Sequence, residues 1–178
     1  MNFVIIDLET TWLSPHKHGI TEIAAVRFNG KNTVETFQSL VNPERHIPSF
    51  ITKLTGITND MISEAPTIQN ILPNFIDFLG EDIFVAHNSS FDLWFLNHAR
   101  YTHFGEYFSN PTLCTRNLAK HLVPELPKRN LAVLCEYFGI KNSRAHRASQ
   151  DVEATIELLK NYLRIAEEKW IDIKDYLK

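Results

Sequence analysis

The sequence predicts an α/β fold, because strand patterns fill its N-terminal part and helical patterns dominate the rest. Residues 3–6 are an unbroken apolar run rich in β-branched side chains, as in a strand buried on both faces. Asn29-Gly30 separates two further strand patterns, which is typical of a hairpin turn. Beyond residue 67, apolar side chains recur at helical spacing on either side of a short apolar strand at 83–86.

Each element is bounded by turn or capping residues. Asn130 is a candidate N-cap and Gly139 a candidate helix end. Residues 42–66 are predicted to form a loop or short helical turns. We expect one domain over residues 1–168 and a short C-terminal tail, 169–178, as an appended helix. The predicted strands are 3–9, 20–28, 33–41, 83–86 and 111–114, and the predicted helices are 67–79, 89–99, 115–121, 131–138 and 149–167.

The overall composition is that of a globular protein with a small negative charge. The 18 basic and 21 acidic residues give a net charge of −3, whereas most nucleic-acid binders carry a basic surplus. A site built from carboxylates would lower this count, and bound metal would reverse its local sign. No apolar run is long enough to cross a membrane, and Cys114 and Cys135 match no zinc-binding spacing. We therefore expect a cytoplasmic protein with free thiols and no membrane partner.

The first strand ends in two acids, Asp7 and Glu9. Side chains two apart on a strand point to the same side, so both carboxylates project together. Close like charges at the end of a buried strand are costly unless a cation lies between them, and such oxygen ligands suit Mg²⁺ or Mn²⁺. A strand that ends in a solvated polar turn is the alternative, and an Asp-x-Glu triplet alone favours it.

Two further acids and a histidine come from helix starts. Asp92 lies in the first turn of one helix, where the macrodipole alone explains an acid. Asp151 lies beside the apolar stripe of the last helix and should face the protein. His146 precedes it in the loop. Four carboxylates and a base are what two-metal phosphodiester hydrolysis requires.

Three motifs in this order resemble the proofreading-type 3′→5′ exonucleases with four acids and a histidine, the DEDDh or DnaQ-like family. The motifs are Asp7–Thr11 (DLETT), His87–Leu96 (HNSSFDLWFL) and His146–Asp151 (HRASQD). Residues 42–66 are also similar to the family. The resemblance extends over residues 3–165 and is strongest to bacterial DNA polymerase III proofreading (epsilon-type) subunits and domains.

The resemblance implies a ribonuclease-H-like fold, with a five-stranded mixed sheet flanked by helices. It implies that two divalent ions, Mg²⁺ or Mn²⁺, are held by four carboxylates, and that His146 is the general base. The implied metal ligands are Asp7, Glu9, Asp92 and Asp151. The terminal nucleotide would be held by residues near Leu8, Thr10, Leu54, Thr55 and Ile57.

Two positions depart from the family pattern. Trp12 stands where glycine is common, and it would change the turn or offer a stacking face to a base. Cys114 stands where aspartate is common, but that position is outside the implied metal set. Four basic residues are candidate phosphate contacts or plain surface charges: Lys128, Arg129, Arg144 and Arg147.

The predicted function is hydrolysis of DNA from free 3′ ends, single-stranded or frayed, with release of nucleoside monophosphates. RNA trimming by an enzyme of the same family is one alternative. A non-catalytic subunit that binds a polymerase and a nucleic-acid end is another, and the complete set of five site residues argues against it. A DNA polymerase is a possible partner, but we expect an enzyme that acts alone rather than a docked subunit.

Overall fold

Strand β1 (Phe3–Thr10) lies at the centre of a five-stranded sheet in the computed structural model, which describes residues 2–142 and 146–178. The strand order is β3-β2-β1-β4-β5. On one side β1, β2 and β3 pair antiparallel, and on the other β4 and β5 run parallel to β1. The predicted mixed sheet and its N-terminal meander are therefore confirmed. The other strands are β2 (Ile20–Phe28), β3 (Thr33–Leu40), β4 (Ile83–Ala86) and β5 (Thr112–Cys114).

The helices begin close to the predicted residues and most also end close to them, but the helix predicted over 89–99 continues to Phe104. Asn130 caps α6 by accepting a hydrogen bond from the Val133 N–H at 2.9 Å, and Gly139 ends it in a left-handed conformation. Residues 42–66, predicted as a loop or short turns, contain two short helices. The helices are α1 (Ser49–Thr55), α2 (Asn59–Ser63), α3 (Ile68–Leu79), α4 (Ser89–Phe104), α5 (Thr115–Leu122), α6 (Leu131–Phe138) and α7 (Ala148–Glu168).

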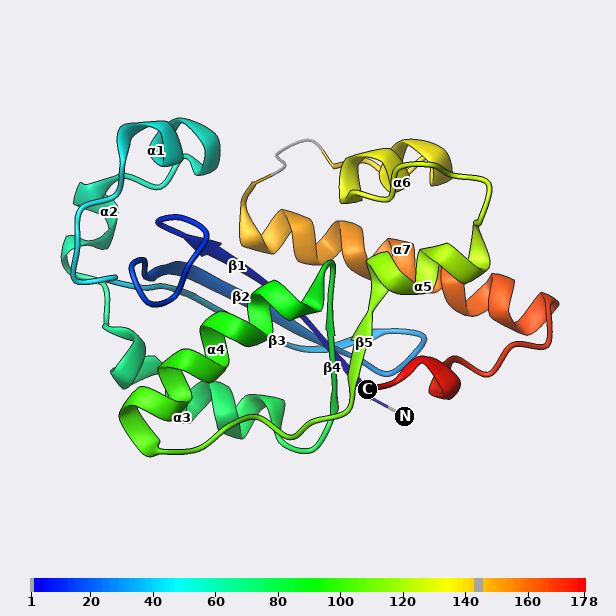
Figure 1. Cartoon of the computed structure of the whole chain (residues 1–178), viewed down its shortest axis with the longest axis horizontal. Helices are drawn as coiled ribbons and strands as arrows, with labels where there is room; N and C mark the ends of the chain where they lie inside the picture. The colour runs from blue at the N-terminus through cyan, green and yellow to red at the C-terminus, as the bar shows by residue number, and fades with distance from the viewer. Residues whose placement is uncertain (1, 143–145) are drawn as a thin grey trace.

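The alternation of side chains along β1 divides the core into two layers. Phe3 and Ile5 face the layer formed with α5, α6 and α7, whereas Val4 and Ile6 face the layer formed with α3 and α4. Figure 1 shows these two groups of helices on opposite sides of the sheet. Because β1 is covered on both faces, its polar residues are confined to its C-terminal end.

A third, smaller cluster of four buried isoleucines holds α1 and α2 together, and Figure 1 shows these helices at one side of the molecule. The C-terminal segment contains a short 3₁₀-helix, Ile173–Tyr176. Lys178 pairs with Thr112 of β5 through two backbone hydrogen bonds of 2.9 and 3.0 Å. Within the described ranges, no helix combines the length and the apolar character needed to cross a membrane.

Candidate active site

The end of β1 extends beyond its neighbour β4. The parallel pairing stops at Ile5 and Val85, so Asp7 and Glu9 lie past the last β4 residue that pairs with β1. On the other side β1 still pairs with β2, where Glu9 lies opposite Glu22. The two acids are thus fixed by a paired strand and open toward the helices that follow β4.

Helix α4 brings Asp92 to the same place. After β4 ends, Asn88 turns the chain with a positive φ of 76°, and α4 begins at Ser89. Asp92, in the first turn, is only 4% exposed, and its charge is the largest charged influence on Asp7. The helix macrodipole favours an acid here, but it does not explain burial against a second carboxylate.

Helix α7 supplies the next carboxylate. Asp151 is 8% exposed, and one of its carboxylate oxygens lies within 4.8 Å of one oxygen each from Asp7 and Glu9, which are equally close to each other. Two donors orient it: the Asn142 Nδ2 lies 2.7 Å from Oδ1, and the His146 backbone N–H lies 2.9 Å from Oδ2. The prediction from sequence missed Asn142, which no motif contains.

His146 lies at the edge of this group. Its backbone has a positive φ of 68° and is tied to Asp151, while its side chain is exposed. The structure therefore brings the histidine to the site through its backbone and leaves its ring open to solvent.

The electrostatics of Asp7, Glu9 and Asp92 favour bound protons or cations. Desolvation, and then the charge of Asp92, raise the pKa of Asp7 well above its usual value. Desolvation also raises the pKa of Asp92 to about 8. Desolvation, with the charges of Asp151 and Glu22, raises the pKa of Glu9 to about 8. Like charges at this separation are stabilised by divalent cations, and an all-oxygen donor set fits Mg²⁺ or Mn²⁺.

The residues predicted to hold the terminal nucleotide differ in exposure: four are buried and one is exposed. Leu8 and Thr10 are buried beside the acids on β1, and the Thr10 hydroxyl donates to the Trp12 carbonyl at 2.7 Å. Thr55 and Ile57 are also buried, where the Thr55 hydroxyl oxygen accepts from the Ile57 N–H at 3.1 Å. Leu54, on α1, is the exposed one, with 48% of its surface accessible.

Trp12 follows the acidic strand and remains accessible. Its side chain is 41% exposed and contacts Phe50 of α1 edge to face, with the ring centroids 4.8 Å apart. Phe50 is itself 49% exposed. Two accessible aromatic rings therefore lie between the end of β1 and α1, where they can stack on a base.

The candidate phosphate contacts differ in whether they already bind other protein groups. Arg147 forms an ion pair with Glu22, and Arg129 donates to the Pro124 carbonyl at 3.0 Å. Lys128 is exposed, and Arg144 lies outside the described residues.

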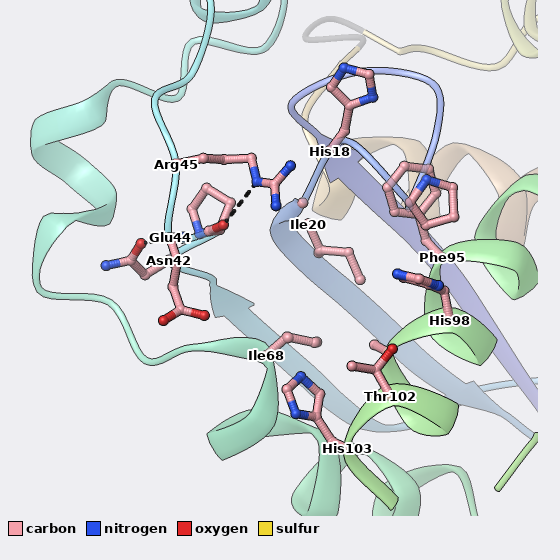
Figure 2. Close-up of a pocket in the computed structure, with 14 residues that line it drawn as sticks. His18, Ile20, Asn42, Glu44, Arg45, Ile68, Phe95, His98, Thr102 and His103 are labelled. Carbon is pink, nitrogen blue, oxygen red and sulfur yellow. Dashed lines mark hydrogen bonds between the residues drawn. The ribbon is translucent and has the colours of Figure 1, made fainter. Parts of the chain in front are cut away.

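A separate hollow of about 160 Å³ lies between the β1–β2 loop, residues 42–45 and α4. Figure 2 shows histidines and an arginine around it: His18, His98, His103 and Arg45. None of the five predicted catalytic and metal-binding residues lines this hollow. Among the residues that the structure describes, the one group with metal-ligand geometry is that of Asp7, Glu9 and Asp151.

A helix-flanked mixed sheet, with carboxylates gathered where the central strand ends, is the arrangement of ribonuclease-H-like nucleases. The family model described as an exonuclease, RNase_T, matches residues 4–159. The chain therefore belongs to this exonuclease family, and its predicted relation to the DnaQ-like 3′-exonucleases is confirmed.

Two relatives show where the chain fits in that family. It is 41% identical over 176 residues to DNA polymerase III subunit epsilon of Aquifex aeolicus, covering 98% of this chain and 86% of the relative. It is 40% identical over 176 residues to the PolC-type DNA polymerase III of Bacillus subtilis, covering 98% of this chain but 12% of the relative. The chain thus corresponds to most of an epsilon subunit and to a small part of the PolC-type polymerase.

Solved structures agree on the fold. The structure of exonuclease X in complex with 5′ overhanging duplex DNA is 29% identical, has a TM-score of 0.77, and is matched over 97% of this chain and 99% of that one. The structure of Escherichia coli exonuclease I in complex with a dA16 oligonucleotide is 22% identical with a TM-score of 0.83, and is matched over 98% of this chain and 42% of that one. The second match supports the fold alone.

Proposed function

We propose that this chain hydrolyses DNA from single-stranded or frayed 3′ ends and releases nucleoside monophosphates. The observation that carries the proposal is the carboxylate group: oxygens of Asp7, Glu9 and Asp151 lie within 4.8 Å of one another, and Asp92 is buried against Asp7. These four residues would hold two divalent ions. When bound, such ions lower the pKa of a coordinated water and neutralise charge on the leaving oxygen.

The protein residues would do the rest. His146 would take a proton from the attacking water, because its side chain is exposed to solvent and its backbone is bonded to the Asp151 carboxylate. Water adds to the phosphorus and the bond from phosphorus to the 3′ oxygen breaks. The departing 3′ oxygen takes a proton from solvent, so the shortened strand keeps a 3′ hydroxyl and the released nucleotide carries the phosphate. Leu54, Trp12 and Phe50 present accessible apolar surface for the terminal bases.

Two relatives are a subunit of DNA polymerase III and a PolC-type DNA polymerase III, so a DNA polymerase is a candidate partner. The free thiols of Cys114 and Cys135 favour a reducing compartment, the cytoplasm. We propose that the domain nevertheless cleaves without a polymerase, since all five catalytic and metal-binding positions of the motifs are filled within one chain.

The test uses purified protein with 5′-labelled single-stranded DNA and an RNA of the same sequence, in Mg²⁺, Mn²⁺ or chelator. We expect a ladder that shortens from the 3′ end of DNA, requires metal, and is lost in Asp7→Ala. Faster cleavage of the RNA would instead support an RNA-trimming enzyme. Cleavage only after addition of a replicative polymerase would support a docked subunit, and cleavage of neither strand under any condition would contradict the proposal.

A further inference from the structure

A fifth carboxylate, Glu22, lies next to the candidate site and belongs to none of the motifs. It is on β2, directly opposite Glu9 in the strand register, and is 1% exposed. A buried carboxylate is costly unless donors surround it. Its contacts therefore indicate what it does.

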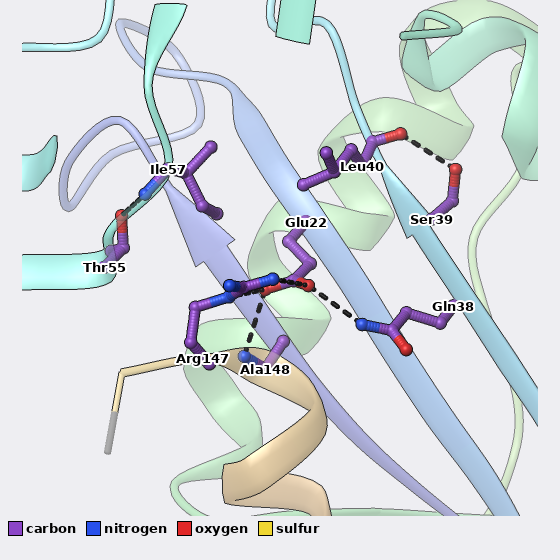
Figure 3. Close-up of polar contacts among 8 residues, drawn as sticks. All are labelled: Glu22, Gln38, Ser39, Leu40, Thr55, Ile57, Arg147 and Ala148. Carbon is purple, nitrogen blue, oxygen red and sulfur yellow. Dashed lines mark hydrogen bonds and ion pairs between the residues drawn. The ribbon is translucent and has the colours of Figure 1, made fainter. Parts of the chain in front are cut away.

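Four hydrogen bonds reach Glu22, and Figure 3 shows them converging on its carboxylate. The Arg147 guanidinium donates from Nη2 to Oε1 at 3.1 Å and from Nε to Oε2 at 3.2 Å. The Ala148 backbone N–H donates to Oε2 at 3.2 Å, and the Gln38 Nε2 donates to Oε1 at 3.0 Å. Each oxygen thus accepts two donors, and three of the four come from the start of α7.

These contacts fix the first residues of α7. Arg147 occupies the N-cap position of that helix, and its own side chain makes no capping hydrogen bond. Glu22 instead satisfies the free N–H of Ala148 from a neighbouring strand, so it replaces a local cap. His146 immediately precedes the fixed segment, and the Asp151 N–H donates to the Arg147 carbonyl at 3.0 Å.

We propose that Glu22 is a positioning residue for the exonuclease site: it holds Arg147 and Ala148 so that Asp151 and His146 stand at the required place against β1. This inference rests on the proposed function. Glu22 acts through the start of α7 rather than as a metal ligand. Both of its oxygens already accept two hydrogen bonds from protein donors.

Glu22→Gln is the informative substitution, because it keeps the size of the side chain. The new amide nitrogen would face two donors whichever way the amide is turned: Arg147 Nη2 with Gln38, or Arg147 Nε with Ala148. The start of α7 should then separate from β2. Arg147→Gln removes the same ion pair from the other side, at a residue that is only partly buried, so this variant should fold.

The matched control is Glu35→Gln on the neighbouring strand β3. Glu35 also forms an ion pair with an arginine, Arg27, at 3.3 Å, but it is exposed and has no contact with α7 among the described hydrogen bonds. The Glu35→Gln protein should therefore lose an ion pair and cleave DNA at the wild-type rate.

The experiment measures kcat and KM on single-stranded DNA across a range of Mn²⁺ for the wild type, each variant and Glu22→Gln/Arg147→Gln. Amide hydrogen exchange of residues 146–151 is measured in parallel. We expect Glu22→Gln and Arg147→Gln each to lose about 10- to 100-fold in kcat with little change in KM, even at saturating Mn²⁺. The double variant should be no worse than the worse single variant, because both break one interaction. Exchange at residues 146–151 should rise in both variants and not in Glu35→Gln.

Three results would overturn the inference: unchanged kcat in Glu22→Gln, full recovery of its activity at high Mn²⁺, or additive losses in the double variant. Recovery at high Mn²⁺ would make Glu22 a metal ligand. A wild-type protein that does not cleave would instead remove the proposed function, and the exchange measurement would still decide whether Glu22 fixes the start of α7.

Discussion

At the scale of single residues, Asp92 shows how burial separates two explanations that sequence leaves open. An acid in the first turn of a helix is usually a solvated partner of the macrodipole. In this chain the side chain is 4% exposed and acts on Asp7. The carboxylate therefore belongs to the acidic site, and its charge destabilises the protein when no cation is bound.

Asp92→Asn should separate activity from stability. We expect metal-dependent cleavage to fall by about 100-fold or more, because a proposed metal ligand is lost. The metal-free protein should become more stable at pH 8, since a carboxyl whose pKa is raised to about 8 no longer ionises in the site. Cleavage assays and thermal unfolding measure the two effects. Asp77→Asn, at an exposed position of α3, is the control, and a less stable Asp92→Asn protein at pH 8 would contradict the account.

Trp12 gives a second prediction at this scale. Trp12→Ala should raise KM for single-stranded DNA by about 10-fold with little effect on kcat, because stacking on one base is worth about 1–3 kcal/mol. Steady-state kinetics on oligonucleotides measures this. Trp170→Ala, which removes a tryptophan that is 95% exposed on the C-terminal segment, should leave KM unchanged. Equal effects of the two substitutions would mean that Trp12 does not contact the substrate.

The motifs predicted which acids lie together at the end of β1, but not the residues that contact them from other parts of the fold. The acids and His146 follow from three local patterns. Glu22 and Asn142 support the same site, but each depends on a partner that only the folded chain brings close: Glu22 and Ala148 are separated by 126 positions. No local pattern in one sequence distinguishes Glu22 from an ordinary polar residue of a strand.

At the scale of elements, helix boundaries follow from capping chemistry. Asn130→Ala should lower the free energy of unfolding by about 1 kcal/mol, because the Val133 N–H loses its acceptor at the start of α6. Denaturant unfolding without metal measures it. Asn117→Ala, at an exposed position inside α5, should cause no loss, since alanine favours a helix interior. A loss as large as that of Asn130→Ala would argue against the capping role.

The sequence predicted helices α6 and α7 with nearly correct bounds, but it did not distinguish the short helices α1 and α2 from a loop. The apolar stripe of α7 and the turn residues around α6 define those helices in the sequence. Helices α1 and α2 have 7 and 5 residues, too few for a helical period to be distinguished from a loop. The order of the strands depends on crossovers through helices, which local patterns do not specify.

At the scale of the whole molecule, pH acts on stability through two opposed sets of groups. Glu9 and Asp92 have pKa values raised to about 8, so their contribution to stability is lost as pH rises toward 8. Burial lowers the pKa of His87 to about 4, so its contribution is lost as pH falls from 6.5 toward 4. Between pH 6.5 and about 8, above the range over which His87 acts, the raised pKa values of the carboxyl groups make stability fall as pH rises.

The metal-free protein should therefore lose thermal stability as pH rises from 6.5 to 8, and Mn²⁺ should restore more stability at pH 8 than at pH 6.5. Thermal unfolding at both pH values, with chelator or with Mn²⁺, measures the difference. A metal-free protein that gains stability over this range would contradict the raised pKa values.

The central claim is that the acids at the end of β1 bind the ions that support cleavage. The most direct measurement is a calorimetric titration of the chain with Mn²⁺ in the presence of thymidine monophosphate, repeated with Asp7→Asn. The account predicts two bound ions for the wild type and the loss of at least one in the variant, whose position lies among all the other acids. No Mn²⁺ binding by the wild type, or the same binding by Asp7→Asn, would contradict it.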